Sequence, residues 1–505
     1  MRAIYPVAEI RTIEQTALRA LPPYTLMQRA GHAAEQAALR ILPDPPHSAR
    51  ILVLAGPGNN GGDALEAAAN LSKAGAEVVA LLATELSQLP HDAANALRRA
   101  QQHGVQLMPA AQFSEIDSAH WALVIDGLFG IGLTRALDGE LRNLVLTINA
   151  MRCPVLALDV PSGLDADTGV VVGPNGVAIK ASHTITFIAD KAGLHTCDGP
   201  DYAGRVEVAS LAITDHHFPP PHAWLNASTL FADYLLPRRR NSHKGSFGEV
   251  TVIGGAEGMI GAPVLAARAA VNCGAGRVLI GFVDHAMAYD SGQPELMCRH
   301  AADLDFTSAV LVAGPGLGLS DAAQALLSRT LDARSWLVLD ADALNLIARE
   351  PVFQQKVMHR QHTAMMTPHP LEAARLLGVS AAAIQADRVA AARALARRFN
   401  AVVILKGAGS IIARANGEVV VNATGNPALA SAGSGDVLSG ICGALLAQGW
   451  PQWQAALAAV WLHGSAADQL VAQGIGPIGL TAGELIPVVR SLLNGLVRDA
   501  ANAGR

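Results

Sequence analysis

Residues 425–440 read G-N-P-A-L-A-S-A-G-S-G-D-V-L-S-G and organise the second half of the chain. The stretch joins small residues to one carboxylate, Asp436, and then to an apolar segment that starts at Val437 and predicts a buried helix. The first amides of a helix lack intrahelical partners and carry partial positive charge, so they favour an anion. The candidate anion hole consists of Gly433, Ser434 and Gly435. Asp436 follows as a candidate base that takes a proton from a substrate hydroxyl. The alternative interpretation is an ordinary helix start in which Asp436 acts only as a cap.

A second Gly-rich cluster, residues 406–410, follows the apolar run 402–405, which predicts a strand. A strand that leads into a Gly-rich turn is a common nucleotide-contacting arrangement. The candidate nucleotide contacts are Lys406, Gly407, Ala408, Gly409 and Ser410. Residues 425–440 also resemble the A-x-G-x-G-D-x-L-x-G signature of the ribokinase-like superfamily. That resemblance implies that Asp436 is the catalytic base, that the preceding glycines form the anion hole, and that Gly435 also contacts the nucleotide.

The composition is that of a large, well-buried globular protein. A chain of 505 residues is too long for one ordinary core, so we expect two or three domains. A hydrophobic content of 51% with 16% charged residues excludes a disordered chain. The formal net charge of -5 gives no electrostatic reason to expect a nucleic acid as partner.

The cysteines and the apolar segments indicate a cytoplasmic protein. The five cysteines are scattered, with no C-x-x-C spacing, as expected of reduced thiols. Charges at Glu9 and Arg11 fall where a signal peptide has its apolar segment. Residues 437–461 lack charge, but Gln448 and Pro451 interrupt them and leave pieces shorter than the ~20 residues that a membrane span needs. We therefore expect buried core helices there and no membrane association.

The first half alternates apolar runs with segments of helical length. Residues 9–42 have a helical pattern, and five apolar runs follow, at residues 51–55, 78–82, 122–125, 155–158 and 184–188. This alternation predicts a mostly parallel sheet with helices on both faces. Ligands of such sheets bind at the carboxyl ends of the strands. The polar motifs of this half lie at those ends, in residues 59–63, 126–130 and 159–165, although each motif alone is also typical of an ordinary turn.

Two carboxylates, Asp126 and Asp159, each directly follow an apolar strand. A buried carboxylate is costly unless it has a partner. A small cation with oxygen ligands from Asn60, Asp126 and Ser162 satisfies this requirement.

Three motifs of this half resemble those of the YjeF N-terminal, or NAD(P)HX epimerase, family: G-P-G-N-N-G-G-D from Gly56, D-G-L-F-G-I-G-L from Asp126 and D-V-P-S-G-L-D-A-D-T-G from Asp159. The resemblance implies that Asp159 is catalytic and that Asn60, Asp126 and Ser162 hold a potassium ion. The substrate contacts that it implies are Asn59, Asn60, Gly61, Gly62, Asp63, Gly130, Ile131, Gly132, Leu133, Thr134, Arg135, Ala136 and Asp159. The sequence departs from the family pattern at Ala64-Leu65-Glu66, where Glu66 stands in the predicted helix.

The pattern changes between the two halves, around His216-His217-Phe218-Pro219-Pro220-Pro221-His222. A run of prolines continues neither a helix nor a central strand, so we expect a linker over residues 216–237. A metal site at the three histidines is the alternative interpretation.

Strand and helix alternate again after residue 241, and polar residues again follow the strands, among them His369 in the turn T-P-H-P. The motifs K-G-S-F-G, G-P-G-L-G, D-A-D-A-L-N, T-P-H-P-L-E, L-K-G and G-S-G-D-V-L-S-G occur in the order seen in the ADP-dependent NAD(P)HX dehydratase family, which they resemble. The resemblance implies that Ala262, Gly316, Gly318, His369 and Asp436 contact the substrate and that ADP, or ATP, binds with Mg²⁺. The family pattern is not kept at residues 428–432, A-L-A-S-A.

The whole chain thus resembles an epimerase fused to a dehydratase that together repair NADHX and NADPHX. We expect an α/β protein with a Rossmann-like three-layer sandwich over residues 1–215, a linker over 216–237 and a ribokinase-like three-layer sandwich over 238–505. We also expect a homo-oligomer. Two alternatives stay open: a ribokinase-like small-molecule kinase fused to a nucleotide-binding domain, and a nucleotide sensor that binds without turnover.

Overall fold

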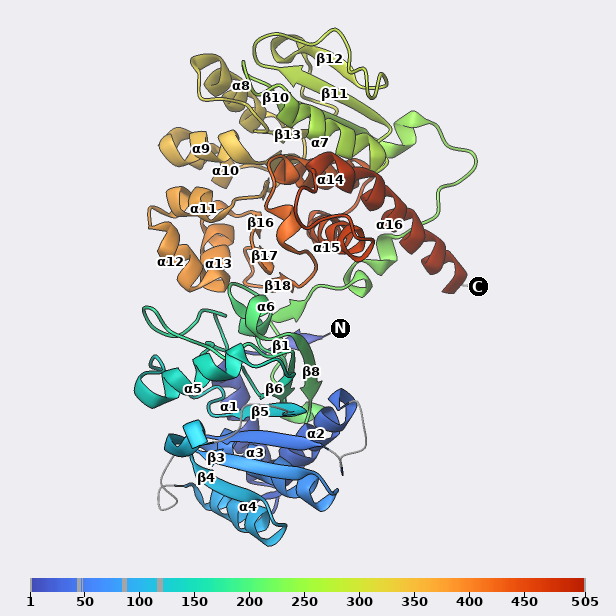
Figure 1. Ribbon diagram of the computed structural model, residues 1–505. Coiled ribbons are helices and arrows are strands. Elements are labelled where there is room, and N and C mark those ends of the chain that lie inside the picture. The colour runs from blue at the N-terminus through green and yellow to red at the C-terminus, as the bar shows by residue number, and fades with distance from the viewer. Residues whose placement is uncertain (1, 43–46, 48, 84–88, 116–120, 504–505) are drawn as a thin grey trace. The chain divides into compact units, whose positions relative to one another are not determined.

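The computed structural model describes residues 2–42, 47, 49–83, 89–115 and 121–503. The described chain divides into two compact units, Arg2–His222 and Ala223–Arg505, and each contains one sheet with helices on both faces (Figure 1). The α/β class and the two layered sandwiches expected from the sequence are confirmed.

The first unit is built on a parallel seven-stranded sheet with the order β4-β3-β2-β5-β6-β7-β8. The order runs outward in both directions from β2, which is the Rossmann-like arrangement, and its switch point lies between β2 and β5. The strands are β2 (Arg50–Ala55), β3 (Glu77–Leu82), β4 (Gln106–Pro109), β5 (Leu123–Gly127), β6 (Val155–Leu158), β7 (His183–Phe187) and β8 (Arg205–Ala209). A short strand, β1 (Ala3–Ile4), pairs through Ile4 with Asp190.

Alternate residues of β2 explain why both faces of this sheet are covered. Ile51 and Val53 pack with one group of helices, whereas Leu52 and Leu54 pack on the opposite face, as the two-residue period of a strand requires. The first group contains α1 (Val7–Leu18), α2 (Thr25–Ile41), α3 (Asn59–Lys73) and α4 (His91–Gln102), and the opposite face carries α5 (Gly139–Ala150) (Figure 1). A four-residue helix, α6 (Gly199–Tyr202), precedes β8.

The helical pattern of residues 9–42 corresponds to two separate helices, α1 and α2. The break contains Pro22 and Pro23, and a proline inside a helix removes a hydrogen bond and clashes with the preceding turn. Tyr24 then adopts a left-handed conformation, with a φ of 69°, before α2 begins.

The second unit contains a larger sheet with the order β9-β18-β17-β16-β15-β14-β13-β10-β11-β12. The hairpins β16-β17 and β17-β18 are antiparallel, and the other pairs are parallel. The strands are β9 (Ala223–Leu225), β10 (Glu249–Gly254), β11 (Arg277–Phe282), β12 (Met297–His300), β13 (Val310–Ala313), β14 (Leu337–Leu339), β15 (Met365–Met366), β16 (Val402–Leu405), β17 (Ser410–Ala413) and β18 (Val419–Asn422). Since β9 pairs with β18, residues 223–225 are a strand within the segment that the prolines predicted to be a linker.

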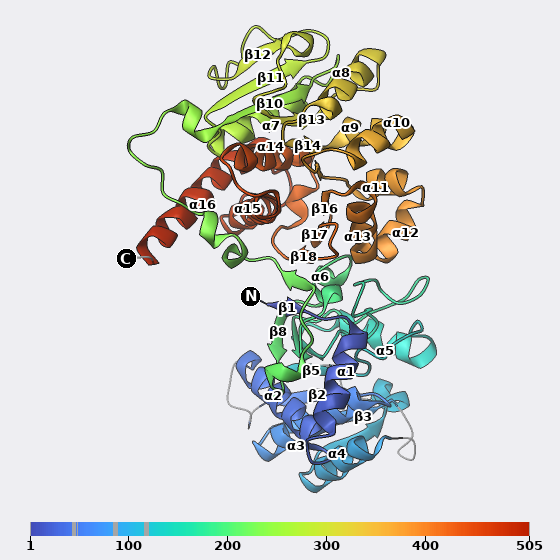
Figure 2. The ribbon, with the colours of Figure 1, turned by 180° about the vertical axis from the view of Figure 1, so that it is seen from behind.

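Helices cover this sheet on both faces, as the opposite views of Figures 1 and 2 show. One layer consists of α7 (Gly261–Asn272), α14 (Ser434–Ala447), α15 (Gln452–Ala472) and α16 (Ala482–Ala503). The other consists of α8 (Asp321–Asp332), α9 (Ala341–Arg349), α10 (Pro351–Met358), α11 (Pro370–Leu377), α12 (Ala381–Ala386) and α13 (Arg388–Phe399). The uncharged residues 437–461 form most of α14 and the start of α15, so the prediction of buried core helices is confirmed. Nowhere in the described ranges does a helix combine the length and the apolarity that crossing a membrane requires.

Candidate active sites

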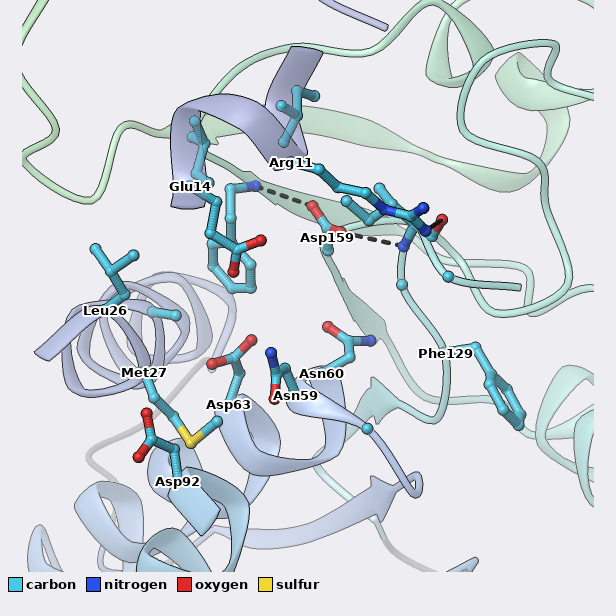
Figure 3. A pocket seen from close by; sticks show the side chains of 18 of the residues that line it. Arg11, Glu14, Leu26, Met27, Asn59, Asn60, Asp63, Asp92, Phe129 and Asp159 are labelled. Carbon is cyan, nitrogen blue, oxygen red and sulfur yellow. Dashed lines mark hydrogen bonds between the residues drawn. The ribbon is translucent and has the colours of Figure 1, made fainter. Parts of the chain in front are cut away.

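The first unit has a cavity of about 500 Å³ at the carboxyl ends of its central strands (Figure 3). Its walls come from α1, α2, the start of α3 and the segments that follow β5, β6 and β7. The predicted contact residues that line it are Asn59, Asn60, Asp63, Gly130, Ile131, Gly132, Leu133 and Asp159. The structure therefore brings together the three strand ends that the sequence analysis singled out.

Five predicted contacts, Gly61, Gly62, Thr134, Arg135 and Ala136, are not among the described residues that line this cavity. Gly61 and Gly62 serve close packing at the start of α3. A Cβ on Gly61 would lie 2.0 Å from the carbonyl oxygen of Gly56, and one on Gly62 would lie 2.5 Å from Cε of Met27. Ala136 is near Gly173, where a Cβ would come within 2.6 Å of the alanine Cβ.

Asp159, the residue that follows β6, is buried, and its backbone is left-handed with a φ of 66°. This conformation is uncommon for a residue other than glycine and occurs often at functional sites. Its Oδ1 lies 2.8 Å from Nζ of Lys191 and accepts a hydrogen bond from the amide of Phe187 at 3.3 Å. Its Oδ2 accepts a hydrogen bond from the amide of Ile131 at 3.4 Å. The carboxylate is thus fixed at the cavity wall with a buried cation behind it.

Lys191 was missed by the sequence analysis. Its side chain is fully buried, and Nζ also donates to Oγ1 of Thr186 at 2.6 Å and to the carbonyl oxygens of Phe187 and Ala189. Buried ammonium groups require such complete pairing. The available signal was a charged pair, Asp190-Lys191, directly after the apolar run 184–188.

Three further carboxyl-bearing residues line this cavity (Figure 3). Asp92 on α4 accepts a hydrogen bond from the amide of Tyr24 at 3.2 Å. The other two are Glu14 on α1 and Asp63 on α3. Burial raises the pKa of Asp63 well above its usual value, and the charges of Asp159 and Glu14 raise it further. Burial also raises the pKa of Glu14, with Asp159 as the next cause. Within the described ranges neither carboxyl group has a hydrogen-bond or ion-pair partner, and Glu14 was not predicted from the sequence.

Asp126 and Ser162 form a fully buried pair next to the cavity. The hydroxyl of Ser162 donates to Oδ1 of Asp126 at 2.7 Å, and its amide donates to Oδ2 at 2.8 Å. Burial raises the pKa of Asp126 to about 6, although these hydrogen bonds and one from Leu128 oppose the increase. In the described part of the chain no cationic side chain pairs with this carboxylate.

Asn60 has a buried side-chain oxygen, Oδ1, that has no hydrogen-bond partner among the described residues, while its Nδ2 donates to the carbonyl of Leu158 at 3.2 Å. The described residues contain no group of three His, Cys, Asp or Glu placed to hold a metal ion. Oxygen donors from one carboxylate, an amide and a hydroxyl, with an unpartnered oxygen among them, fit a hard cation such as potassium. The predicted donor set therefore fits a single monovalent cation.

Glu66, the departure from the family pattern, is buried on α3 and has its own partners. It pairs with Arg99 on α4 and accepts a hydrogen bond from the hydroxyl of Tyr24. Gly31 on α2 leaves room for it, because a Cβ there would lie 2.3 Å from Cγ of Glu66. The substitution is thus accommodated away from the cavity.

In the second unit, Asp436 lies in the first turn of α14, whose N-cap residue is Gly433 with a φ of 88°. A Cβ on Gly433 would lie 3.9 Å from Oδ2 of Asp436, so this carboxylate lies close to the helix start. Burial raises the pKa of Asp436 to about 7, with a further increase from Asp340 and an opposing effect from Lys406. A carboxyl group with a pKa near neutrality is suited to accept a proton.

Lys406, at the end of β16, brings the predicted nucleotide turn to the start of α14. Its Nζ lies 2.7 Å from Oδ1 of Asp340, and 3.2 Å from the position of a Cβ on Gly435. The turn that follows it is held by Arg388, a buried residue that the sequence analysis missed and whose guanidinium donates to the carbonyl oxygens of Leu405 and Lys406. Ser410 closes the turn through its hydroxyl, which donates to the carbonyl of Gly407 at 3.1 Å.

The predicted substrate contacts of this half approach the same strand ends. A Cβ on Gly316 would lie 3.3 Å from Cβ of Ala262. The amide of Gly318 donates to Oδ2 of Asp342 at 2.9 Å, and the charge of Asp342 also raises the pKa of Asp436. Gly316, Gly318 and Asp436 are thus connected through neighbouring strand ends.

His369 is the N-cap of α11, where Nδ1 accepts hydrogen bonds from the amides of Leu371 and Glu372. Its Nε2 lies 3.3 Å from Oε1 of Glu372. Burial lowers the pKa of His369, and the charge of Lys406 lowers it further. The histidine therefore lies near the lysine of the nucleotide turn and is also a structural cap.

Comparisons with known proteins match both units of the chain. Residues 250–487 match the family described as NAD(P)H-hydrate dehydratase, and residues 23–193 match the family described as YjeF-related protein N-terminus. A bifunctional NAD(P)H-hydrate repair enzyme of Coxiella burnetii is 39% identical, over 98% of this chain and 100% of the relative. One of Escherichia coli is 37% identical, over 94% of this chain and 90% of the relative.

Among solved structures, an ADP/ATP-dependent NAD(P)H-hydrate dehydratase from Bacillus subtilis, co-crystallised with ATP and Mg²⁺, is 29% identical. It matches with a TM-score of 0.48, over 54% of this chain and 98% of that chain. The resemblance found in the sequence motifs is confirmed by the two family matches and the full-length relatives. The chain belongs to the bifunctional NAD(P)H-hydrate repair enzymes, which combine an epimerase domain and a dehydratase domain in one polypeptide.

Proposed function

We propose that Asp436 is the base of the dehydratase and that the amides of residues 433–435 stabilise the transferring phosphoryl group. The substrate carries a hydroxyl on a ring carbon next to the nitrogen, and hydroxide is a poor leaving group. Transfer of a phosphoryl group from the nucleotide to this hydroxyl turns it into phosphate, which the nitrogen lone pair then expels. Asp436 accepts the hydroxyl proton during the transfer, and the helix N-terminus balances the charge that develops. The observation that carries this proposal is the carboxyl of Asp436, with a pKa raised to about 7, beside Gly433.

We further propose that Lys406, Gly407, Ala408, Gly409, Ser410 and Gly435 hold ADP, with ATP as a second donor. The ion pair of Lys406 with Asp340 supports this role, because it fixes the ammonium group beside the start of α14. Bound with the nucleotide, Mg²⁺ would neutralise phosphate charge. Ala262, Gly316, Gly318 and His369 would then contact the nicotinamide substrate.

In the epimerase half, we propose that Asp159 moves the proton during interconversion of the two epimers of NADHX and NADPHX. The contacts proposed for the substrate are residues 59–63, residues 130–136 and Asp159. Eight of these residues line the cavity. The buried oxygens of Asn60, Asp126 and Ser162 would hold potassium, which when bound neutralises the carboxylate and orients the pyrophosphate. The pairing of Asp159 with Lys191 supports this role, because it fixes the carboxylate at the cavity wall.

Single substitutions test the two assignments separately. Asp436→Ala should abolish dehydration of the substrate epimer while epimer exchange continues, and Asp159→Ala should do the reverse. Dehydration within a few fold of the unchanged enzyme in Asp436→Ala would remove this residue from the mechanism. A stable phosphorylated product would instead favour the small-molecule kinase, and binding without turnover at both sites would favour the sensor.

Three expectations from the sequence stay predictions: the domain limits at residues 215 and 238, a homo-oligomer, and a cytoplasmic location. The molar mass of the purified chain in solution tests the oligomer, and separate expression of residues 1–215 and 238–505 tests the limits.

A further inference from the structure

The epimerase cavity carries more acid–base groups than the proposed role of Asp159 uses. Glu14 lies on α1, outside every motif that the sequence analysis identified, and its carboxyl group points into the cavity (Figure 3). Of the described residues, none forms a hydrogen bond or an ion pair with it. A half-buried carboxyl group without a partner is costly, so its presence at a substrate cavity calls for a role in substrate chemistry.

One residue, Ile131, connects Glu14 and Asp159 in space. Its amide donates to Oδ2 of Asp159 at 3.4 Å, and its carbonyl accepts a hydrogen bond from Arg11 at 3.3 Å. Arg11 precedes Glu14 on α1 by about one turn and also lines the cavity. The same loop therefore fixes both the helix that carries Glu14 and the carboxylate of Asp159.

Inversion of a carbon that bears a hydroxyl, when it proceeds by loss of that hydroxyl and re-addition of water, requires proton transfer on both faces of the ring. If the hydroxyl departs from one face and water adds to the other, one group must give a proton to the departing oxygen and another must take a proton from the attacking water. In the reverse direction the two groups exchange these roles. A single carboxylate on one wall of the cavity cannot serve both faces.

We propose that Glu14 is the second acid–base group of the epimerase and serves the ring face opposite to that served by Asp159. This inference rests on the proposed role of Asp159. In one direction Glu14 gives its proton to the hydroxyl, the C–O bond breaks, and the nitrogen lone pair forms a C=N⁺ bond as water leaves. A water molecule then attacks the same carbon from the other face, the electron pair returns to nitrogen, and Asp159 takes the proton.

The local charges fit this division of roles. Asp159 has the ammonium of Lys191 at 2.8 Å, whereas Glu14 has no such partner among the described residues, and its burial and the charge of Asp159 raise its pKa. The other carboxyl groups that line the cavity are those of Asp63, on α3, and Asp92, on α4, and Asp92 already accepts a hydrogen bond from the Tyr24 amide. Two carboxyl groups in such different surroundings are the usual basis of an acid–base pair.

The test compares Glu14→Gln with Glu9→Gln, the same chemical change on the same helix at a residue that does not line the cavity. Exchange between purified NADHX epimers is followed without nucleotide, so that dehydration does not contribute. Glu14→Gln should lower kcat by on the order of 10²–10⁴-fold with KM within threefold of the unchanged enzyme, whereas Glu9→Gln should leave both unchanged. Circular dichroism and the dehydratase rate of the same variant show that it is folded.

Two results would overturn the inference. One is a kcat of Glu14→Gln within threefold of the unchanged enzyme, or a loss confined to KM. The other comes from exchange in water enriched in oxygen-18: the proposed step incorporates one labelled atom at each inversion, and inversion without label contradicts it. Asp159→Ala separates the two levels of the account. If the Asp159→Ala variant exchanges epimers at the normal rate, the proposed epimerase site is wrong. If Asp159→Ala is inactive but Glu14→Gln exchanges epimers at the normal rate, only the role of Glu14 is wrong.

Discussion

The Nζ atom of Lys191 lies 2.8 Å from Oδ1 of Asp159, and the lysine side chain is completely buried. Lys191 also donates to Oγ1 of Thr186 and to two carbonyl oxygens, so its position does not depend on Asp159 alone. Asp159 in turn has a left-handed backbone that follows directly from the end of β6. The carboxylate proposed to act in the epimerase is therefore held in place by a residue that no sequence motif includes.

Replacement of Lys191 by Met should both destabilise the first unit and slow epimer exchange. Removal of one partner from a buried ion pair costs about 3–5 kcal/mol, because the other charge stays buried without compensation. Unfolding in urea measures this loss. The double variant with Asp159→Asn should be less destabilised than the sum of the single variants, and full additivity would show that the pair does not interact.

The dehydratase rate should fall below a pH of about 7, because Asp436 must be ionised to accept a proton and its pKa is raised to about 7. The charge of Asp342 contributes to this increase. Asp342→Asn should therefore lower the pKa of Asp436 and move the acid limb of the profile to lower pH. A profile of kcat against pH for both proteins measures the shift, and movement in the opposite direction contradicts the assignment of Asp436 as base.

Gly433→Ala should lower the dehydratase kcat by roughly 10²–10³-fold, the loss expected when an anion hole is displaced. The new Cβ would lie 2.5 Å from Cδ1 of Leu265, in a residue with a φ of 88°. Gly474→Ala is a matched control, since its φ is 82° and its Cβ would meet no atom within 4 Å. Both variants introduce backbone strain of ~1–3 kcal/mol, but only Gly433→Ala should lose activity. Equal losses in both would remove the helix start from the mechanism.

Potassium should stabilise the first unit more than choline at equal ionic strength, because a ligand that binds only the folded state raises its stability. Asn60→Ala removes the buried Oδ1 that has no partner among the described residues, so this difference should disappear. Thermal unfolding of residues 1–215, or of the full chain if that segment does not fold alone, measures it. An identical potassium effect in Asn60→Ala would place the ion elsewhere.

The fold was largely predictable, because apolar runs ended by Asp, Asn or Gly mark strands that open onto a ligand site. The run at residues 402–405 matches β16 at both ends, and the run at residues 155–158 matches β6. The strands β17 and β18 were not predicted. They extend the sheet as an antiparallel hairpin after the nucleotide turn, and Ser410, predicted as a nucleotide contact, is the first residue of β17.

The residues missed at the site are those whose position depends on tertiary packing. Glu14 lies beside the buried stripe of α1 that Ile10, Ile13 and Ala17 form. The sequence signal for it was a charged residue next to the apolar face of a predicted helix. Arg388 donates to the carbonyl of Leu405 on β16, and Lys191 pairs with Asp159 after β6; no local pattern predicts these long-range contacts. Motifs thus predict the residues at strand ends, whereas the groups that fix their charge and position come from the assembled fold.

The most direct test of two cooperating sites is the recovery of NADH from a mixture of both NADHX epimers with ADP, Mg²⁺ and potassium. The account predicts complete recovery by the unchanged enzyme, none by Asp436→Ala, and recovery by Asp159→Ala that slows sharply once the dehydratase substrate epimer is consumed. Spontaneous epimerisation in buffer alone sets the residual rate. Complete recovery by Asp159→Ala at the rate of the unchanged enzyme, or recovery by Asp436→Ala, would contradict it.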